Sequence, residues 1–499
     1  MKVIIQKKED LKKKIEYPVF VPFKKDSLYL KEIFGEDNVR FFENLIKANK
    51  GDSDNRIKTA YIRDGAFKYS VILYSLEFTY EAKDFLIAGK KAITFLKDQY
   101  CRTMYYIPFE DVLEISDSYE FSKSFIEGLF YGSYFFERYK SDKKEFSLDT
   151  LNIVTSNKKI INFIENGYDY IPILFKHIDI ARNLINEPAN EITPSTFSEY
   201  VRLNSNKNID IQIWDDKEIE QRGFNLISAV GRGSKNKQRF IKMRYEGKEN
   251  RDFIYVVGKG VTFDSGGTNL KPTGFIETMK SDMSGAAIAY SIINLLADLN
   301  VRCNIISLIP LVENSVSADS YKPGDIYKSY SGKTVEILNT DAEGRLILAD
   351  SLAYAVKNNN ARLIIDIATL TGAMVVALGS YCAGYFTNDE DLSTKFIEAS
   401  KRAREDFYRL PLYKGYKDRI KSKIADLQNI SKDKREAGAI IAALFLQEFV
   451  GTTPWLHLDI AGPAFLTEEH PIYGSGATSF GLKTLYELIS KEYDIKNKR

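Results

Sequence analysis

The stretch Asn339-Thr340-Asp341-Ala342-Glu343-Gly344-Arg345-Leu346 leads from a polar run into a helix of the α/β pattern that fills the second half of the chain. Leu346 to Lys357 carry apolar side chains at helical spacing, so we predict a helix there. Alternate residues of an extended chain share one face, and the preceding segment therefore aims Asp341, Glu343 and Arg345 into the same space. Two carboxylates and a guanidinium in this arrangement suit a divalent metal ion and a bound anion. A surface Asx turn that caps the helix is the alternative interpretation.

Strands and helices alternate on both sides of this stretch from Asp252 onward. The expected strands cover residues 253–257, 304–309, 363–367 and 456–460, and the expected helices cover residues 284–299, 346–357 and 438–450. This order predicts a mainly parallel sheet with helices on both faces. Ligands of such sheets collect at the carboxyl ends of the strands, where Lys259, Asp264 and Thr369 each follow a strand.

The length of 499 residues exceeds what one hydrophobic core usually supports, so we expect more than one domain. Residues 1–165 are predicted to form a smaller α/β domain without a recognisable catalytic constellation, residues 166–183 a helical connection, and residues 184–499 the catalytic domain. The elements expected in the first domain are strands at Tyr69 to Leu76 and Thr103 to Phe109 and a helix at Glu120 to Tyr139. In the second domain, Pro194 is expected to begin a helix that Thr193 caps.

The charge balance gives no electrostatic case for binding nucleic acid or an anionic membrane. Lys and Arg total 70 against 68 for Asp and Glu, a formal net charge of +2. Cys101, Cys303 and Cys382 lie far apart and show no metal or redox spacing, which fits a reducing compartment. The first residues, Met1 to Lys8, hold too few apolar side chains for the core of a signal peptide. We therefore expect a cytoplasmic protein.

Residues 367–388 carry no charge and are long enough to imitate a membrane span. Threonine, serine and glycine make the segment polar, and its start continues the strand expected at residues 363–367. We predict that this segment is a buried strand running into a loop beside the active site, and that the protein does not cross a membrane.

A second stretch, Val257-Gly258-Lys259-Gly260-Val261-Thr262-Phe263-Asp264-Ser265-Gly266-Gly267, is followed by Lys271-Pro272 and by Met279-Lys280-Ser281-Asp282-Met283. Together with residues 339–346, these motifs closely resemble the leucyl aminopeptidase, or cytosol aminopeptidase, family. The resemblance covers roughly Arg182 to the C-terminus. It continues through Asn186 to Asn190, Ala368 to Ala373, Ala425 to Asn429 and His457 to Gly462. Several long motifs in the right order are far more specific than a lone glycine-rich loop.

The resemblance implies two divalent metal ions. Asp264 and Glu343 would bridge both ions, Asp341 would serve the more exchangeable one, and Asp282 and Lys259 would serve the tighter one. None of the three histidines has a partner at ligand spacing, so the site is expected to be rich in oxygen. Zn²⁺ and Mn²⁺ are the ions we expect, with Mg²⁺ and Co²⁺ as alternatives, because oxygen ligation leaves the choice open. Four carboxylates balance two divalent ions, so we expect the metal-free protein to be inactive and looser in this region.

The same resemblance implies an aminopeptidase that releases N-terminal leucine and similar residues from peptides by attack of a metal-activated water. Lys271 would stabilise the oxyanion, and a bicarbonate held by Arg345 would act as general base. The residues expected around the first side chain of the substrate are Met279, Thr369, Leu370, Gly372 and Ala373. Adaptable and small side chains of this kind suit leucine.

The family also implies a homohexamer and a first domain of macro-like fold. Two alternative functions stay open at this point. One is a dipeptidase that prefers substrates such as cysteinylglycine. The other is a DNA-binding scaffold, as in some bacterial relatives, although the near-zero net charge argues against it.

Overall fold

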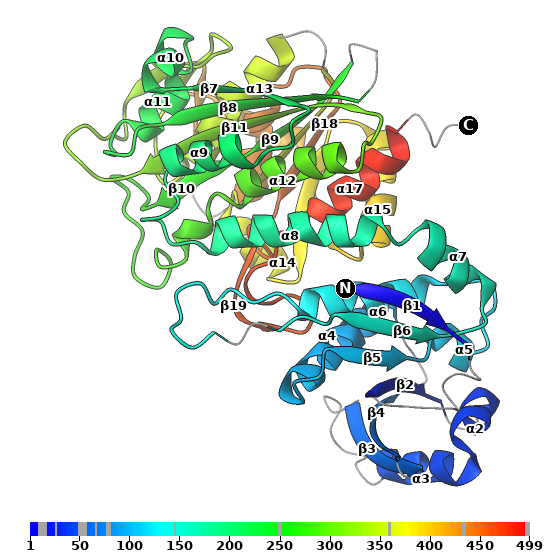
Figure 1. Ribbon diagram of the computed structural model, residues 1–499. Coiled ribbons are helices and arrows are strands. Elements are labelled where there is room, and N and C mark those ends of the chain that lie inside the picture. The colour runs from blue at the N-terminus through cyan, green and yellow to red at the C-terminus, as the bar shows by residue number, and fades with distance from the viewer. Residues whose placement is uncertain are drawn as a thin grey trace. The chain divides into compact units, whose positions relative to one another are not determined.

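The computed structural model describes residues 1–7, 17–24, 27–47, 57–64, 67–75, 81–143, 146–247, 252–357, 361–431 and 436–494. The chain forms two compact units. The first unit comprises Met1–Phe175 with His470–Gly474, and the second comprises Lys176–Glu469 with Ser475–Arg499. Each unit contains a mainly parallel sheet with helices, so the predicted α/β class is confirmed (Figure 1).

The first unit is built on a six-stranded sheet with the order β1-β6-β5-β2-β4-β3. Its strands are β1 (Lys2–Gln6), β2 (Val19–Phe23), β3 (Ile57–Asp64), β4 (Phe67–Ser75), β5 (Thr103–Tyr106) and β6 (Thr150–Val154). Neighbouring strands run parallel except for β3, which pairs antiparallel with β4 at one edge. The helices of this part of the chain are α2 (Leu28–Phe34), α3 (Glu36–Lys47), α4 (Ala82–Asp98), α5 (Phe109–Val112), α6 (Glu120–Gly132) and α7 (Lys158–Asn166). Helix α8 (Tyr170–Asn186) begins in the first unit and continues into the second.

Two predictions for the first unit need correction at their ends. The strand expected to reach Phe109 ends at Tyr106, because Pro108 has no N–H for a ladder and instead precedes α5. The helix expected to reach Tyr139 ends at Gly132. A Cβ on Gly128 would lie 2.1 Å from the Leu86 carbonyl oxygen, so α4 and α6 pack backbone against backbone. The strand expected from Tyr69 to Leu76 begins two residues earlier, at Phe67, and its last expected residue lies outside the described part of the chain.

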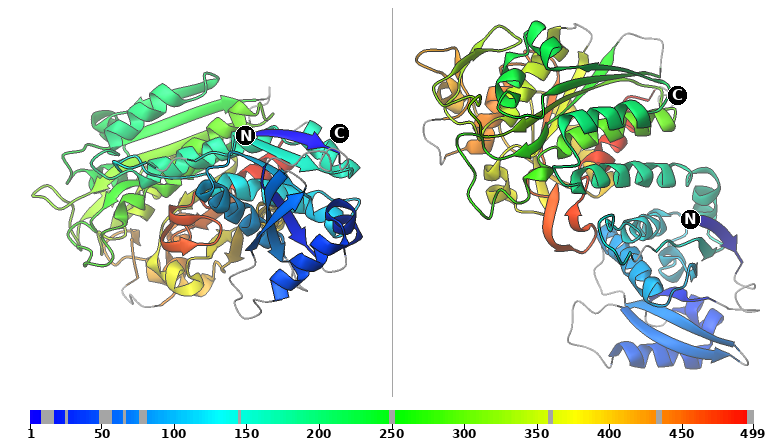
Figure 2. Two further views of the ribbon diagram at one scale, coloured as in Figure 1. Left: turned by 60° about the horizontal axis from the view of Figure 1, so that its bottom comes forward. Right: turned by 60° about the vertical axis from the view of Figure 1, so that its left-hand side comes forward.

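The second unit contains a nine-stranded sheet with the order β16-β15-β18-β14-β9-β11-β8-β7, and β10 pairs with β11. Its strands are β7 (Ile209–Trp214), β8 (Arg239–Glu246), β9 (Phe253–Gly258), β10 (Gly260–Asp264), β11 (Asn304–Asn314), β14 (Ala361–Ala368), β15 (Cys382–Thr387), β16 (Asp406–Arg409) and β18 (Trp455–Asp459). The central strands β18, β14, β9 and β11 run parallel, as predicted. Antiparallel pairs occur toward the edges, where β15 meets β18 and β8 meets β11 and β7. Figure 2 shows these strands from two further directions.

Helices cover both faces of this sheet. The helices of the second unit are α9 (Pro194–Asn204), α10 (Asp216–Gln221), α11 (Asn225–Gly231), α12 (Ser284–Asp298), α13 (Gly344–Lys357), α14 (Gly372–Leu378), α15 (Glu390–Ala403), α16 (Gly438–Gln447) and α17 (Leu482–Glu492). Ile306 and Leu308 of β11 pack into a core with α11, α13 and α16. Ser307, between them, donates a hydrogen bond of 2.8 Å to the Ala289 carbonyl of α12 on the other face. The alternation of side chains along one strand thus separates the two helix layers.

Three helix predictions in the second unit agree closely with the structure. Helices α12, α13 and α16 begin within two residues of the predicted starts. Thr193 caps α9 as expected, since its side chain accepts the Thr196 N–H at 3.2 Å. Two smaller sheets join β12 (Ile326–Lys328), β13 (Thr334–Glu336) and β17 (Leu427–Gln428), and β19 (Phe465–His470) with β20 (Gly474–Ala477).

The uncharged segment at residues 367–388 differs from its prediction. It contains the end of β14, the short helix α14 and the strand β15, rather than one strand running into a loop. Thr371 begins α14 by accepting the Met374 N–H, and Gly379, with φ of 69°, ends it. Strand β15 is held by β18, which lies about 70 residues further along the chain. Among the described residues, no helix is long and apolar enough to cross a membrane.

Candidate active site

Five of the predicted site residues meet at the carboxyl ends of the central strands. Lys259 lies in the turn between β9 and β10, and Asp264 is the last residue of β10. Asp282 follows the 3-10 helix η1 (Met279–Ser281), just before α12. Asp341 and Glu343 lie in the turn that enters α13. One carboxylate oxygen from each of Asp264, Asp341 and Glu343 lies within 4.8 Å of the others.

Lys259 holds one side of this cluster together. Its side chain is 3% exposed, and its Nζ lies 2.7 Å from Asp282 Oδ1 and 2.9 Å from Glu343 Oε1. The same Nζ donates to the Thr369 carbonyl oxygen at 3.0 Å. A Cβ on Gly344 would lie 2.5 Å from Lys259 Cε, so a side chain at this position would displace the tip of the lysine.

Lys271 holds the other side. Its Nζ lies 2.9 Å from Asp264 Oδ2 and 2.5 Å from Asp341 Oδ1. The structure therefore brings together all five proposed metal ligands and the proposed oxyanion-stabilising lysine. Each ammonium bridges two carboxylates.

The pKa values in the cluster follow from burial and from close charges. Burial, with the neighbouring Glu343 carboxylate, raises the pKa of Asp264 to about 6 against the opposing effect of Lys271. Burial also raises the pKa of Asp282. Burial alone would raise the pKa of Glu343, but the Lys259 and Lys271 ammonium groups outweigh it and lower this pKa. Burial lowers the pKa of each lysine, and the surrounding carboxylates more than offset it, so both lysines are ammonium ions here.

The residues fit divalent metal ions. Asp282 Oδ2 and Glu343 Oε2 are buried and have no hydrogen-bond partner, which leaves two carboxylate oxygens for a cation. Four carboxylates and two ammonium groups leave the cluster net negative by two charges. Neither buried histidine of the second unit competes, since His177 bonds to Asp298 and His457 bonds to Asp366. The donors are therefore mainly oxygen, as the sequence predicts.

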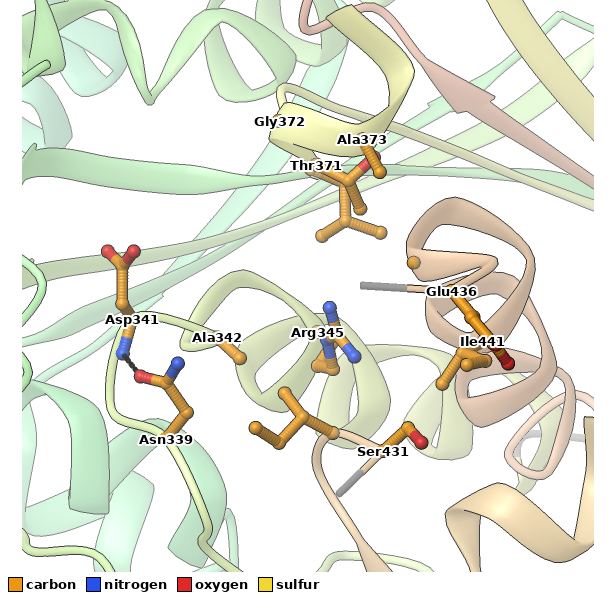
Figure 3. Close-up of a pocket in the computed structure, with 13 residues that line it drawn as sticks. Asn339, Asp341, Ala342, Arg345, Thr371, Gly372, Ala373, Ser431, Glu436 and Ile441 are labelled. Carbon is orange, nitrogen blue, oxygen red and sulfur yellow. Dashed lines mark hydrogen bonds between the residues drawn. The ribbon is translucent and has the colours of Figure 1, made fainter. Parts of the chain in front are cut away.

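A pocket of about 220 Å³ opens beside this cluster. Its lining residues are Asn339, Asp341, Ala342, Arg345, Leu370, Thr371, Gly372, Ala373, Ile430, Ser431, Glu436, Gly438 and Ile441. Figure 3 shows Arg345 in the middle of the pocket, with Asp341 on one side and Ile441 on the other. Of the residues expected around a substrate side chain, Leu370, Gly372 and Ala373 line this pocket. Met279 and Thr369 do not line it and lie next to Asp282, which Thr369 contacts through its hydroxyl at 2.8 Å.

Arg345 is a fixed cation in this pocket. Its Nη1 donates to the Asn429 carbonyl oxygen at 2.6 Å, and its Nε is buried without a hydrogen-bond partner. Burial lowers its pKa to about 10, which still leaves the guanidinium charged at neutral pH. A buried guanidinium with a spare donor beside a cavity suits a small planar anion.

Residues 179–486 match the sequence profile described as the cytosol aminopeptidase family, catalytic domain. The chain belongs to the cytosol aminopeptidase family. The resemblance read from the motifs is thereby confirmed, and the protein is a metal-dependent aminopeptidase, a hydrolase of peptides.

Similar proteins include two named "Probable cytosol aminopeptidase". The one from Clostridium perfringens is 43% identical over 374 residues, which cover 74% of this chain and 76% of that protein. The one from Protochlamydia amoebophila is 41% identical over 385 residues and covers 76% of each chain. Among solved structures, the bottromycin maturation enzyme BotP in complex with Mn superposes with a TM-score of 0.79 at 29% identity, over 95% of this chain and 98% of that one.

Two positions of this cytosol aminopeptidase carry contacts that the sequence did not reveal. Asp459, at the end of β18, accepts the Leu370 N–H at 3.1 Å and the Thr371 hydroxyl at 2.7 Å. Asn314, at the end of β11, donates to Asp264 Oδ1 at 2.8 Å. Each is a polar residue at the carboxyl end of a strand that the sequence places in the central sheet. The rule that ligands collect at such ends was the available signal.

Proposed function

We propose that this cytosol aminopeptidase releases leucine and similar apolar residues from the N-termini of peptides with the help of two divalent metal ions. The observation that carries the proposal is the buried cluster of four carboxylates, in which Asp282 Oδ2 and Glu343 Oε2 lack partners. In the proposal, Asp264 and Glu343 would hold both ions, and Asp341 would complete one site. Asp282 and Lys259 would complete the other, with Lys259 giving up its proton as the ion binds, because an ammonium group has no lone pair to donate. Two carboxylate pairs, each already gathered around one cation, support a division into two sites.

Bound divalent ions lower the pKa of water and polarise a carbonyl oxygen, which is the chemistry that peptide hydrolysis needs. In our proposal Lys271 donates a hydrogen bond to the scissile carbonyl oxygen as negative charge builds there. Asp264 and Asp341 support this role, because they raise the pKa of Lys271 and keep it protonated. Arg345 holds a bicarbonate as general base, and its partner-free Nε supports that part of the proposal.

The pocket supports a preference for apolar side chains. Leu370, Ala373, Ile430 and Ile441 are apolar residues among those that line it. A volume of about 220 Å³ suits one aliphatic side chain next to the scissile bond. Met279 and Thr369 lie beside Asp282. We propose that they contact the first residue of the peptide on the side that faces the metal cluster.

Zinc or manganese is the proposed ion, because the ligands are mainly oxygen and the similar BotP structure was solved in complex with Mn. We further propose a homohexamer in the cytoplasm. Its support is family membership and the word cytosol in the names of the relatives.

The test is hydrolysis of leucine p-nitroanilide by protein stripped of metal and then titrated with manganese or zinc. We expect added metal to restore leucine release in the parent and not in Asp341→Asn, which keeps the size of the side chain but removes its charge. A folded protein that releases no leucine with any of these ions would contradict the proposal. In bicarbonate-free buffer we expect a lower rate that added bicarbonate restores, and an unchanged rate would remove the role given to Arg345.

A further inference from the structure

We propose that Asn314 is a positioning residue of the metal site. It turns the Asp264 carboxylate so that Oδ2 faces the other ligands, and it ties this carboxylate to the loop that carries Asp341. The inference rests on the proposed function, because it concerns the residues proposed to hold the ions.

Asn314 is fully buried at the end of β11, where it is the register partner of Asp264 on β10. Its Nδ2 donates to Asp264 Oδ1 at 2.8 Å, and the Gly266 N–H donates to the same oxygen at 2.9 Å. Two donors therefore occupy Oδ1. The other oxygen, Oδ2, lies 2.9 Å from Lys271 Nζ, inside the cluster. The carboxylate thus has one oxygen anchored by two neutral donors and one oxygen that faces a cation, the Lys271 ammonium group.

The second hydrogen of the same amide reaches a different part of the site. Asn314 Nδ2 also donates to the Thr340 carbonyl oxygen at 3.0 Å, directly before Asp341 in the chain. Thr340 is further connected to the Asp264 turn, because its hydroxyl donates to the Gly266 carbonyl oxygen at 2.7 Å. Asn314 therefore sets the distance between two ligand-bearing segments that are far apart in sequence.

An amide is the side chain that this position requires. Its carbonyl oxygen, Oδ1, is buried without a hydrogen-bond partner. The opposite amide orientation would place this oxygen against Asp264 Oδ1 and the Thr340 carbonyl, two further acceptors. An aspartate would make the same unfavourable contact. Gly267, with φ of 64°, closes over the amide, and a Cβ there would lie 2.8 Å from Asn314 Oδ1.

Loss of this amide should weaken metal binding more than it weakens folding. Substitution of groups that orient metal ligands typically lowers metal affinity or activity by about 10- to 100-fold. Tyr321 provides an internal comparison, because its hydroxyl donates its single hydrogen to the same Thr340 carbonyl oxygen at 2.7 Å and so does not donate to Asp264. If metal affinity depends on the orientation of Asp264, loss of the Asn314 amide should lower this affinity more than loss of the Tyr321 hydroxyl.

The experiment measures manganese binding to the metal-stripped full-length protein by calorimetry, with leucine p-nitroanilide kinetics as a second readout. The variants are Asn314→Leu, of similar size without donors, and Asn314→Ser, which keeps one donor and serves if the first does not fold. Asn294→Leu is the matched control, because Asn294 is 2% exposed and uses its amide in bonds of 2.7 and 2.9 Å within and beside α12. Tyr321→Phe isolates the Thr340 contact.

We expect manganese to bind Asn314→Leu about 10- to 100-fold more weakly than the parent, with a smaller loss for Asn314→Ser and parent-like affinity for Asn294→Leu. Parent-like affinity in the Asn314 variants would overturn the inference. An equal loss in Tyr321→Phe and Asn314→Leu would also overturn it, since the Thr340 contact would then carry the effect. Failure of the parent itself to bind either manganese or zinc would instead overturn the proposed function.

Discussion

The Lys259 side chain is closely packed on every side that the contacts describe, and we infer that the chemistry requires a glycine at position 344. Asp282, Glu343 and the Thr369 carbonyl each lie within 3.0 Å of its Nζ. A Cβ on Gly344 would lie 2.7 Å from that Nζ and 2.5 Å from Cε. Gly344 begins α13 and does not have a positive φ, so the backbone here does not require glycine. The site requires glycine because it has no side chain that would occupy the space of the lysine.

We expect Gly344→Ala to lower kcat about 100-fold, because displacing a catalytic group by about 1 Å costs this much. Folding stability should hold, since alanine in a helix is favoured over glycine by about 0.5–1 kcal/mol. Steady-state kinetics beside urea unfolding measures both quantities. A variant with the kcat of the parent would show that Lys259 can move without consequence.

At the scale of elements, one loop links the pocket to the metal cluster. Asp459 of β18 holds the Leu370 N–H and the Thr371 hydroxyl. The preceding residue, Thr369, contacts Asp282 and Lys259. Thr371 also caps α14, whose first residues line the pocket. The end of a central strand therefore positions a pocket wall and a ligand at once.

Thr371→Val should loosen that wall. It removes the hydroxyl that donates to Asp459 and accepts from Met374, and loss of a helix cap costs about 1 kcal/mol. We expect KM for leucine p-nitroanilide to rise severalfold. Thr193→Val is the matched control, because Thr193 caps α9 in the same way and lines no part of the pocket. If both variants were destabilised to a similar extent and both showed the same rise in KM, the loop at Thr371 would have no specific effect on substrate binding.

The elements also show which parts of the fold the sequence could predict. Helix α12 was predicted from Ser284 to Leu299 and ends at Asp298, because its continuous apolar pattern is a local signal. Helix α14 was missed, since Gly372 to Leu378 is short and mixes glycine with two valines. Strand β15 was missed because β18, a distant segment, pairs with it.

The same distinction holds for the site. Lys259, Asp264, Asp282, Asp341 and Glu343 stand in motifs, and the structure brings them together. The contacts of Asn314 and Asp459 join segments 50 and 89 residues apart. The position of each residue at a strand end was a signal in the sequence, but its bonding partner was not. The roles assigned to these ligands stay predictions until metal binding is measured.

At the scale of the whole molecule, all of the proposed ligands and pocket residues belong to the second unit. The first unit has its own aromatic core, in which Phe20 is fully buried and its ring contacts those of Tyr74, Tyr106 and Phe125. We expect Phe20→Ala to destabilise this unit by about 3–5 kcal/mol. Hydrogen exchange should quicken in residues 17–24 and 103–106, while manganese affinity stays at the parent value. Weaker manganese binding would show that the first unit supports the metal site.

Removal of the metal ions should change the second unit and leave the first unit unchanged. The sequence alone led us to expect repulsion among four bare carboxylates, but Lys259 and Lys271 each bridge two of them and remove part of that repulsion. We therefore expect metal-stripped protein to lose activity and yet keep its fold. Two buried carboxylate oxygens still lack partners, so local protection should be incomplete without a cation.

Manganese should then slow hydrogen exchange in residues 257–283 and 339–346 and leave residues 17–24 unchanged. A ligand at 1,000 times its Kd stabilises the state that binds it by about 4 kcal/mol, which is large enough to measure peptide by peptide. Sodium chloride at the same ionic strength serves as the control. Complete loss of protection throughout the second unit on stripping would mean that the two lysines do not offset the carboxylate charge. Equal protection with and without manganese would mean that the cluster does not bind it.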